Sequence, residues 1–426
     1  MERRTRGQTV PLTPVDQERN GLTRSVVTTG VPAAWPLPLA AAPIPGLAVM
    51  GIGSWPRPRW MLQAMHERRE GRLADADFEA AAEDAVRLAV GAQIRSGVDV
   101  VTDGEQRRDN SASFMSGWLD NCPLIPLPAL RPLVDDPETF TSELHPLDVP
   151  AAEVRHPAIV GLLGRRQPLA AQEYAFVRTL TERPVKMTLP GPYLLTRLMW
   201  VEGIADRVYR SCEHLAEDVV RVLREELRAL LAAGVALVQL DEPVLSEAVF
   251  AGARHTRRCT GRALSDKGAA ALELAFARRL LDRVLAELPR ERLALHVCRG
   301  EFTPDERAAL AGDYRPLLPL LAEVRVGTLF LELSTPRPGE LDVLLDLPDE
   351  VRIGVGVVDH NREAIEPMAE IAARARRAVR LFGDHRVLLT PDCGFATFAS
   401  RPAAPAGVAE AKLRALVEAA ELVRRG

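Results

Sequence analysis

Four residues of metal-ligating type stand at the ends of short apolar runs in the second half of the 426-residue chain. His296 and Cys298 lie two apart in one run, so in a strand both side chains point to the same side. Glu332 lies near the end of a second run, and Cys393 directly follows a third. An imidazole, two thiolates and a carboxylate suit zinc (Zn²⁺), which accepts nitrogen, sulfur and oxygen ligands in a tetrahedron. We therefore predict a zinc site at these four residues.

The distribution of the four ligands over three separate runs favours a catalytic site over a structural one. A structural zinc is typically held by local pairs such as C-x2-C that clip a loop. A thiol has an ordinary pKa of ~8.5 and is deprotonated when it binds a metal ion. Two thiolates and a carboxylate over-neutralise Zn²⁺, which then splits water poorly but leaves a bound substrate thiolate nucleophilic. The predicted chemistry is activation of a small thiol for alkyl transfer, with Glu332 displaced by the incoming sulfur.

Eight short apolar runs alternate with long amphipathic helices from about residue 46 onwards. Nearly continuous hydrophobicity is expected of parallel strands that are buried on both faces. The runs begin at Leu47, Val98, Val185, Val235, Leu293, Thr328, Arg352 and Val387. The clearest helices cover residues 77–96, 205–233, 265–288, 362–382 and 408–425. Eight such strands predict an α/β fold, a (β/α)8 TIM barrel; a doubly wound sheet is the alternative.

Two segments do not follow this alternation. Residues 1–45 are polar and then rich in Pro and Ala, without helical or strand period, and predict an irregular N-terminal extension. Residues 46–426 form the predicted barrel domain. The stretch 107–183, after the second strand, is too long for one crossover and rich in proline. It predicts an insertion, such as a lid or cap over the barrel mouth.

Small or polar residues, which a buried strand does not need, end almost every run. They are Gly53-Ser54, Asp103-Gly104-Glu105, Pro190-Gly191-Pro192, Asp241-Glu242-Pro243, His296 with Cys298, Glu332, Asp359-His360 and Asp392-Cys393-Gly394. The carboxyl ends of barrel strands converge on one face, where such enzymes place their chemistry. Taken singly, Asp392 is equally well explained as a helix N-cap, and Cys122, Cys212 and Cys259 as small core hydrophobes. The coincidence of all eight segments predicts one pocket.

Composition excludes several other classes of protein. The net charge of −4, without a basic stripe interleaved with aromatics, argues against nucleic-acid binding. The apolar stretch 31–52 contains five prolines and cannot form a membrane-spanning helix. Five widely spaced cysteines do not describe a disulfide framework and suit a reducing cytoplasm, so we expect a cytoplasmic protein.

Eight motifs, in chain order, resemble the C-terminal catalytic domain of cobalamin-independent methionine synthase. They are Ile52-Gly-Ser-Trp-Pro, Thr102-Asp-Gly-Glu-Gln-Arg, Leu189-Pro-Gly-Pro, Gln239-Leu-Asp-Glu-Pro-Val-Leu, His296-Val-Cys, Leu331-Glu-Leu-Ser, Gly354-Val-Gly-Val-Val-Asp and Pro391-Asp-Cys-Gly-Phe. The resemblance covers about residues 46–405, and the chain is similar to the short, single-barrel form of the family. It implies a methyltransferase of methionine biosynthesis with zinc on His296, Cys298, Glu332 and Cys393.

The resemblance also implies a binding site for an amino-acid thiol such as homocysteine. The backbone at Gly53 and Ser54 would bind the substrate carboxylate, and the carboxylates of Glu105 and Asp241 would grip the ammonium group. The alternatives are a salt bridge from Glu105 to Arg107 or Arg108, and a buried capping role for Asp241.

Catalytic roles are implied for two further residues, Asp359 and His360, with His360 as the acid that protonates the leaving amine. The sequence departs from the family here, because His360 directly follows Asp359. Leu198 stands where the family has a folate-stacking tryptophan, and Trp200 follows two residues later. The methyl donor therefore stays open between a methyl-folate, a methylcobalamin-carrying protein and another small methyl donor.

Three other functions fit parts of the same pattern. Epoxyalkane–coenzyme M transferases use a similar zinc barrel, but their thiol has no α-amino group for Glu105 and Asp241 to bind. Uroporphyrinogen decarboxylase-like barrels need no metal, which leaves His296, Cys298 and Cys393 unexplained. A catalytically inactive paralogue that binds a thiol is the non-enzymatic alternative.

Overall fold

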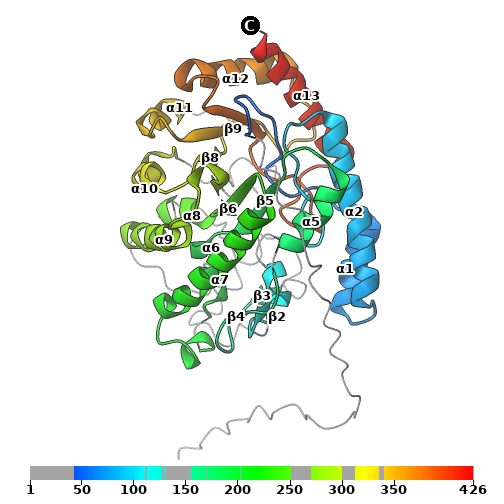
Figure 1. Cartoon of the computed structure of the whole chain (residues 1–426), viewed down its shortest axis with the longest axis vertical. Helices are drawn as coiled ribbons and strands as arrows, with labels where there is room; N and C mark the ends of the chain where they lie inside the picture. The colour runs from blue at the N-terminus through cyan, green and yellow to red at the C-terminus, as the bar shows by residue number, and fades with distance from the viewer. Residues whose placement is uncertain are drawn as a thin grey trace, which may run out of the picture. The chain divides into compact units, whose positions relative to one another are not determined.

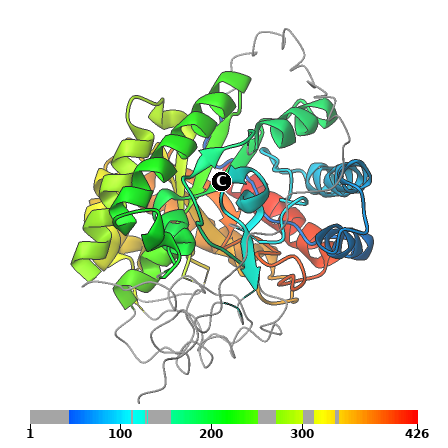
Figure 2. The ribbon, with the colours of Figure 1, turned by 90° about the horizontal axis from the view of Figure 1, so that it is seen from below.

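The computed structural model describes residues 43–110, 113–126, 129, 155–168, 170–201, 203–250, 270–299, 312–334 and 340–425. Figure 1 shows that the helices lie outside the strands, and the view turned by 90° in Figure 2 shows them on both sides of the strands. Residues 1–42, nearly all of the predicted N-terminal extension (1–45), lie outside the described residues.

Six parallel strands form one continuous sheet whose order follows the chain. They are β5 (Lys186–Pro190), β6 (Leu237–Asp241), β7 (Leu293–Val297), β8 (Thr328–Leu331), β9 (Arg352–Val358) and β10 (Val387–Pro391). All their residues except Arg352 are buried, as strands covered on both faces must be.

Two further segments link the ends of this sheet through isolated parallel bridges. The bridges are Val49–Leu389, Met50–Val100 and Val101–Val185. The first two predicted strands therefore lie between β10 and β5, although their pairing is much shorter than the sequence suggests. The fold is an α/β (β/α)8 TIM barrel, as predicted, and the doubly wound alternative is wrong.

Alternate strand residues face the barrel interior. One buried apolar cluster contains Ala48, Met50, Ile52, Val100, Leu237, Ala294, Phe330 and Leu388. Because side chains alternate along a strand, residues two or four places further on face the same side, now at the carboxyl ends. Asp241, His296 and Glu332 occupy such positions, two or four residues after members of this cluster.

The helices bury apolar stripes against the outside of the strands. They are α1 (Arg59–Arg69), α2 (Asp75–Ser96), α5 (Ala171–Leu180), α6 (Pro192–Met199), α7 (Cys212–Ala233), α8 (Val244–Phe250), α9 (Ala270–Leu285), α10 (Leu318–Glu323), α11 (Glu340–Val343), α12 (Met368–Phe382) and α13 (Ala406–Arg424). Two begin later than predicted. Helix α12 begins after Pro367, and α7 begins after Ser211, whose side chain accepts a hydrogen bond from the backbone N–H of His214.

The segment predicted as an insertion, 107–183, contains short antiparallel pairs where it is described. Strand β1 (Leu119–Asp120) pairs with β4 (Gly164–Arg165), and β2 (Leu124–Pro126) pairs with β3 (Arg155–Pro157). The segment ends in α5, which packs against α2 and α7. None of the helices in the described residues has the length and apolar character needed to cross a membrane.

Candidate metal centre

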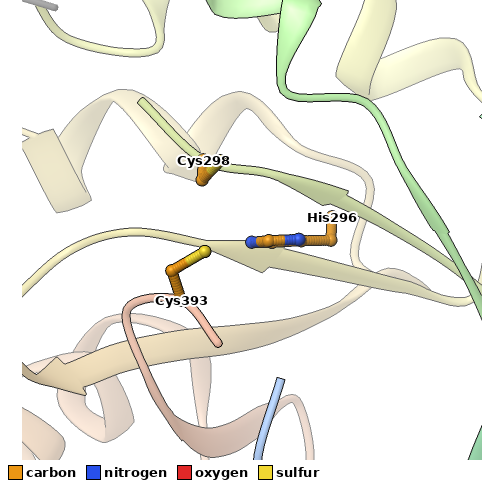
Figure 3. Close-up of side chains that lie close together, drawn as sticks. All are labelled: His296, Cys298 and Cys393. Carbon is orange, nitrogen blue, oxygen red and sulfur yellow. The ribbon is translucent and has the colours of Figure 1, made fainter. Parts of the chain in front are cut away.

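Three of the four predicted metal ligands converge at the carboxyl ends of the strands. His296 lies on β7, Cys298 directly follows that strand, and Cys393 follows β10. One potential ligand atom from each residue lies within 4.8 Å of the other two, and all three residues are buried. Figure 3 shows the imidazole ring of His296 extending towards the two cysteines. Strand β7 and the loop after β10 therefore bring residues nearly 100 positions apart into one cluster.

The two nitrogens of His296 have different environments. Nδ1 donates a hydrogen bond to Oδ1 of Asp241 at 2.8 Å. Nε2 is buried and has no hydrogen-bond partner in the described part of the chain. Burial lowers the pKa of His296, but the hydrogen bond and the charge of Asp241 outweigh it and leave the pKa above its ordinary value. A buried nitrogen without a partner is costly, and a metal ion is the partner that a neutral imidazole so oriented would take.

The two cysteines lie close enough for their sulfurs to interact. A hydrogen bond with Cys298, burial and the charges of Cys298 and Glu332 all raise the pKa of Cys393 well above that of a free thiol. Two neighbouring thiolates are thus unfavourable in the protein alone. A bound divalent cation reverses this preference, because it deprotonates the thiols that coordinate it. The donor set of one imidazole nitrogen and two sulfurs fits zinc.

Glu332, the fourth predicted ligand, is not part of the three-residue group. Its Oε2 accepts a hydrogen bond from the backbone N–H of Arg299 at 2.8 Å, and its own N–H donates to the Tyr314 hydroxyl at 3.0 Å. The charge of Glu332 raises the pKa of Cys393, so the carboxylate of Glu332 lies near the cluster.

In the sequence, Asp392 is equally well explained as a helix N-cap, but its Oδ1 accepts hydrogen bonds from the N–H groups of Leu333 and Ser334 at 2.9 Å. These bonds connect the segment after β10 to the segment after β8.

Asp241, predicted to bind the substrate ammonium group, contacts the metal cluster. In addition to His296, its Oδ1 accepts a hydrogen bond from Nε2 of Gln239 at 2.7 Å. The signal for this contact is the strand register, because Asp241 and His296 are direct neighbours across β6 and β7. Sequence reasoning without that register does not find it.

Glu105, the second predicted ammonium ligand, is buried in the loop after Val101. Its φ of 54° lies in the left-handed region, which is uncommon for a residue with a side chain. Its Oε1 accepts a hydrogen bond from Thr188 Oγ1 at 2.9 Å. A Cβ on Gly53 would lie 2.3 Å from that oxygen, so glycine is required for this approach. Burial raises the pKa of Glu105, against the opposing charge of Arg108.

The predicted alternative for Glu105, a salt bridge to a neighbouring arginine, does not occur in the described residues. Arg107 pairs with Glu79 at 2.9 Å, and Arg108 pairs with Glu173 at 2.7 Å. Arg108 also donates to Thr188 Oγ1 at 3.0 Å. The threonine that contacts Glu105 is therefore itself held in place by a buried cation.

Ser54 lies against the loop that carries Cys393. Its Oγ accepts a hydrogen bond from the N–H of Ala396 at 3.2 Å, and its carbonyl accepts from the N–H of Phe395 at 3.0 Å. Arg57, which the sequence did not single out, donates to the carbonyls of Glu105 (2.6 Å) and Ala396 (2.7 Å). The loops that carry Glu105 and Cys393 are thus joined through the segment around Ser54.

Asp359 and His360 follow β9 and do not belong to the three-residue group. Asp359 Oδ1 accepts a hydrogen bond from the N–H of Asn361 at 2.8 Å, and its carboxylate forms an ion pair with Arg362 at 3.2 Å. His360 is buried. Among the remaining cysteines, burial raises the pKa of Cys122 to about 12, as expected of a core thiol, and Cys259 lies outside the described residues.

Fold and site together define a TIM-barrel enzyme with a histidine–cysteine–cysteine centre at the barrel mouth. The model of the family "Cobalamin-independent synthase, Catalytic domain" matches residues 47–122 and 147–422. The chain belongs to this family, in agreement with the resemblance of its motifs, and is an enzyme, a methyltransferase.

Individual relatives agree with this assignment along nearly the whole barrel. The methionine synthase of Saccharolobus solfataricus is 24% identical over 383 residues, which cover 89% of this chain and 96% of the relative. The methionine synthase of Sulfurisphaera tokodaii is 25% identical and covers 89% and 94%. The B12-independent methionine synthase of Shewanella sp. W3-18-1, solved in complex with selenomethionine, has a similar fold, with a TM-score of 0.65, 22% identity and coverage of 89% and 98%.

Proposed function

We propose that the enzyme transfers a methyl group to the sulfur of homocysteine or a closely similar amino-acid thiol. The observation that carries this proposal is the unpartnered Nε2 of His296, which lies with the sulfurs of Cys298 and Cys393 in one buried group. The names of the relatives, methionine synthases, agree with that acceptor.

His296, Cys298 and Cys393 would hold the zinc ion, and Glu332, whose carboxylate lies beside them, would serve as an exchangeable fourth ligand. Bound there, the zinc would supply the positive charge that keeps the acceptor sulfur deprotonated at neutral pH. Asp241 keeps the proton of His296 on Nδ1, so that Nε2 presents its lone pair.

The carboxylate of Glu105 would bind the ammonium group of the acceptor, together with Asp241. Thr188 holds Oε1 of Glu105 in place, and ionised carboxylates accept strong hydrogen bonds from ammonium groups. The backbone at Gly53 and Ser54 would bind the acceptor carboxylate. Because burial raises the pKa of Glu105, the ionised form gains from a bound cation, which makes an amino acid a better acceptor than a thiol without an amino group.

Asp359 and His360 are proposed to serve the methyl donor. His360 would donate a proton to the leaving amine of a methyl-folate, and Asp359 would hold the loop that carries it through its bond to Asn361. A methylcobalamin-carrying protein is the other donor, and it would not need this proton. His360→Asn should therefore impair transfer from methyl-folate and spare transfer from methylcobalamin.

A thiol-methylation assay with purified zinc-loaded protein tests the acceptor. Homocysteine and coenzyme M are offered in parallel, each with a methyl-folate, with methylcobalamin and with an epoxyalkane, and products are identified by mass spectrometry. We expect methionine from homocysteine and no methylated coenzyme M. Alkylation of coenzyme M by an epoxide would support the epoxyalkane–coenzyme M transferase instead. Thiol binding without any transfer would support the inactive paralogue.

A further inference from the structure

A lysine is buried inside the barrel below the candidate metal centre. Lys186 is the first residue of β5 and has no exposed surface. It pairs in register with Leu237, a member of the interior apolar cluster, so its side chain faces the same interior. Its Nζ lies 4.2 Å from the centroid of the Phe330 ring. A fully buried lysine is rare and costly, and the proposed methyl transfer assigns it no role.

The lysine is connected to His296 by a chain of three buried hydrogen bonds. Lys186 Nζ donates to Oε1 of Gln239 at 2.6 Å, and Gln239 Nε2 donates to Oδ1 of Asp241 at 2.7 Å. The same oxygen of Asp241 accepts the Nδ1–H of His296 at 2.8 Å. The four residues lie on the neighbouring strands β5, β6 and β7.

The chemistry of the two ends allows only one orientation of the Gln239 amide. An ammonium group has donors and no acceptor, and a carboxylate has acceptors and no donor. With the amide reversed, two donors would face each other at Lys186 and two acceptors at Asp241. Gln239 therefore delivers an N–H to Asp241, and the carboxylate accepts the Nδ1–H of His296, so in the neutral imidazole Nε2 is the atom with the free lone pair.

We propose that Lys186 and Gln239 are positioning residues, which fix the metal-ligating tautomer of His296 through Asp241. The inference rests on the proposed metal site, in which His296 is a ligand. It assigns a function to two interior residues that touch neither the metal cluster nor the thiol.

The surroundings of the lysine are shaped to hold it. A Cβ on Gly354 would lie 2.1 Å from the Phe330 ring, so the ring packs directly on the backbone of β9. The Lys186 cation lies over the same ring, within the range of a cation–π interaction. Burial lowers the pKa of Lys186 to about 7, against the charges of Asp241 and Glu105. Both the ammonium and the neutral amine carry N–H donors, so the amine can donate to Gln239 in either state.

A second explanation is that Lys186 merely neutralises the charges of Asp241 and Glu105. The two explanations differ for Gln239→Met, which keeps the cation and breaks the hydrogen-bond chain. Under the positioning role, Lys186→Met and Gln239→Met each weaken zinc binding by about 10–100-fold, as loss of an outer partner of a ligand does. The double variant is then no weaker than the singles, because one chain is broken once. Under charge neutralisation alone, Gln239→Met binds zinc like the wild type.

The experiment measures zinc affinity of the full chain by competition with a chromophoric chelator. The tautomer of His296 is followed in the metal-free protein by ¹⁵N NMR of the imidazole. Lys412→Met is the matched control. Lys412 is also fully buried, but its Nζ donates to Ala364 O at 2.6 Å and pairs with Glu366 at 2.9 Å, and neither contact involves His296. The Lys412→Met substitution should lower stability without changing zinc affinity.

The outcomes separate the inference from the proposed function. Unchanged affinity and unchanged tautomer in Lys186→Met and Gln239→Met would overturn the inference while the metal site stands. A wild-type protein that binds no zinc would overturn the proposed function first. If Lys186→Met does not fold, Gln239→Met and its tautomer spectrum decide the question, because that variant adds no charge and removes none.

Discussion

The two sides of the candidate pocket differ in how far the protein itself satisfies their polar atoms. On the metal side, Nε2 of His296 has no hydrogen-bond partner in the described part of the chain, and the Cys393 thiol resists ionisation. On the other side, Glu105 accepts a hydrogen bond from Thr188, and Ser54 accepts one from Ala396. The metal side therefore needs a cation for completion, whereas the carboxylate side is already built. Substitutions on the two sides should accordingly affect different quantities.

The largest effect is expected for Cys393→Ser, on the metal side. Loss of a ligand should lower zinc affinity by more than about 100-fold, beyond the effect of losing an outer partner of a ligand, and should abolish methyl transfer. Chelator competition and the methylation assay measure the two effects. Cys122→Ser is the control, since Cys122 is a buried core thiol. A Cys393→Ser protein that retains full zinc content would show that Cys393 is not a zinc ligand.

Glu105→Gln, on the carboxylate side, should leave zinc affinity unchanged and raise KM for homocysteine by about 10–100-fold. The loss of a hydrogen bond to a charged group is worth ~1.5–3 kcal/mol, which corresponds to that range. Steady-state kinetics together with zinc analysis of the same preparation test this. Equal losses of zinc and of homocysteine use would show that the two sides are not separate.

A smaller effect is expected for Gly53→Ala. The added Cβ would lie 2.3 Å from Glu105 Oε1 and must displace the carboxylate. Misplacing one hydrogen bond costs ~0.5–1.5 kcal/mol, so KM for homocysteine should rise about 2–10-fold at unchanged zinc affinity. Gly51→Ala serves as the matched control, because a Cβ there would meet no atom within 4 Å. Identical kinetics of the two variants would argue against a role for Glu105 in substrate binding.

The smallest effect concerns stability and pH on the carboxylate side. The pKa of Glu105 is raised by burial above that of an unfolded glutamate. The folded state thus binds the proton of the Glu105 carboxyl group more tightly than the unfolded state does. The contribution of this proton to the free energy of unfolding is fully present below the unfolded pKa of ~4.3 and is lost as the pH rises through the folded pKa. Glu105→Gln has no such proton to lose, so its free energy of unfolding relative to the wild type should increase between pH 4.5 and 7.5. Urea denaturation of the metal-free proteins measures it, and a constant difference would contradict the raised pKa.

The sequence predicts those parts of the molecule that depend on local periodicity. The two-residue spacing of His296 and Cys298 places both on one side of β7, and the polar residues after each apolar run locate the barrel mouth. Pairing between distant segments is less accessible. The first two strands reduce to single bridges such as Met50–Val100, because their neighbours, rather than their composition, determine how far pairing extends.

Contacts that depend on strand register could not be predicted. The bond between Asp241 and His296 requires that β6 and β7 align those two residues, which the sequence does not state. Lys186 stands at the start of an apolar run, where its charge argues for a strand end at the surface rather than for the barrel interior. The position of Glu332 outside the three-residue group likewise depends on its bond to the backbone of Arg299.

X-ray absorption at the zinc edge of the zinc-loaded protein tests the central claim most directly, because it reports the atoms bound to the metal. A centre on His296, Cys298 and Cys393 predicts two sulfur ligands at ~2.3 Å and one or two nitrogen or oxygen ligands at ~2.0–2.1 Å. A shell of nitrogen and oxygen alone, without sulfur, would place the zinc elsewhere and contradict the account.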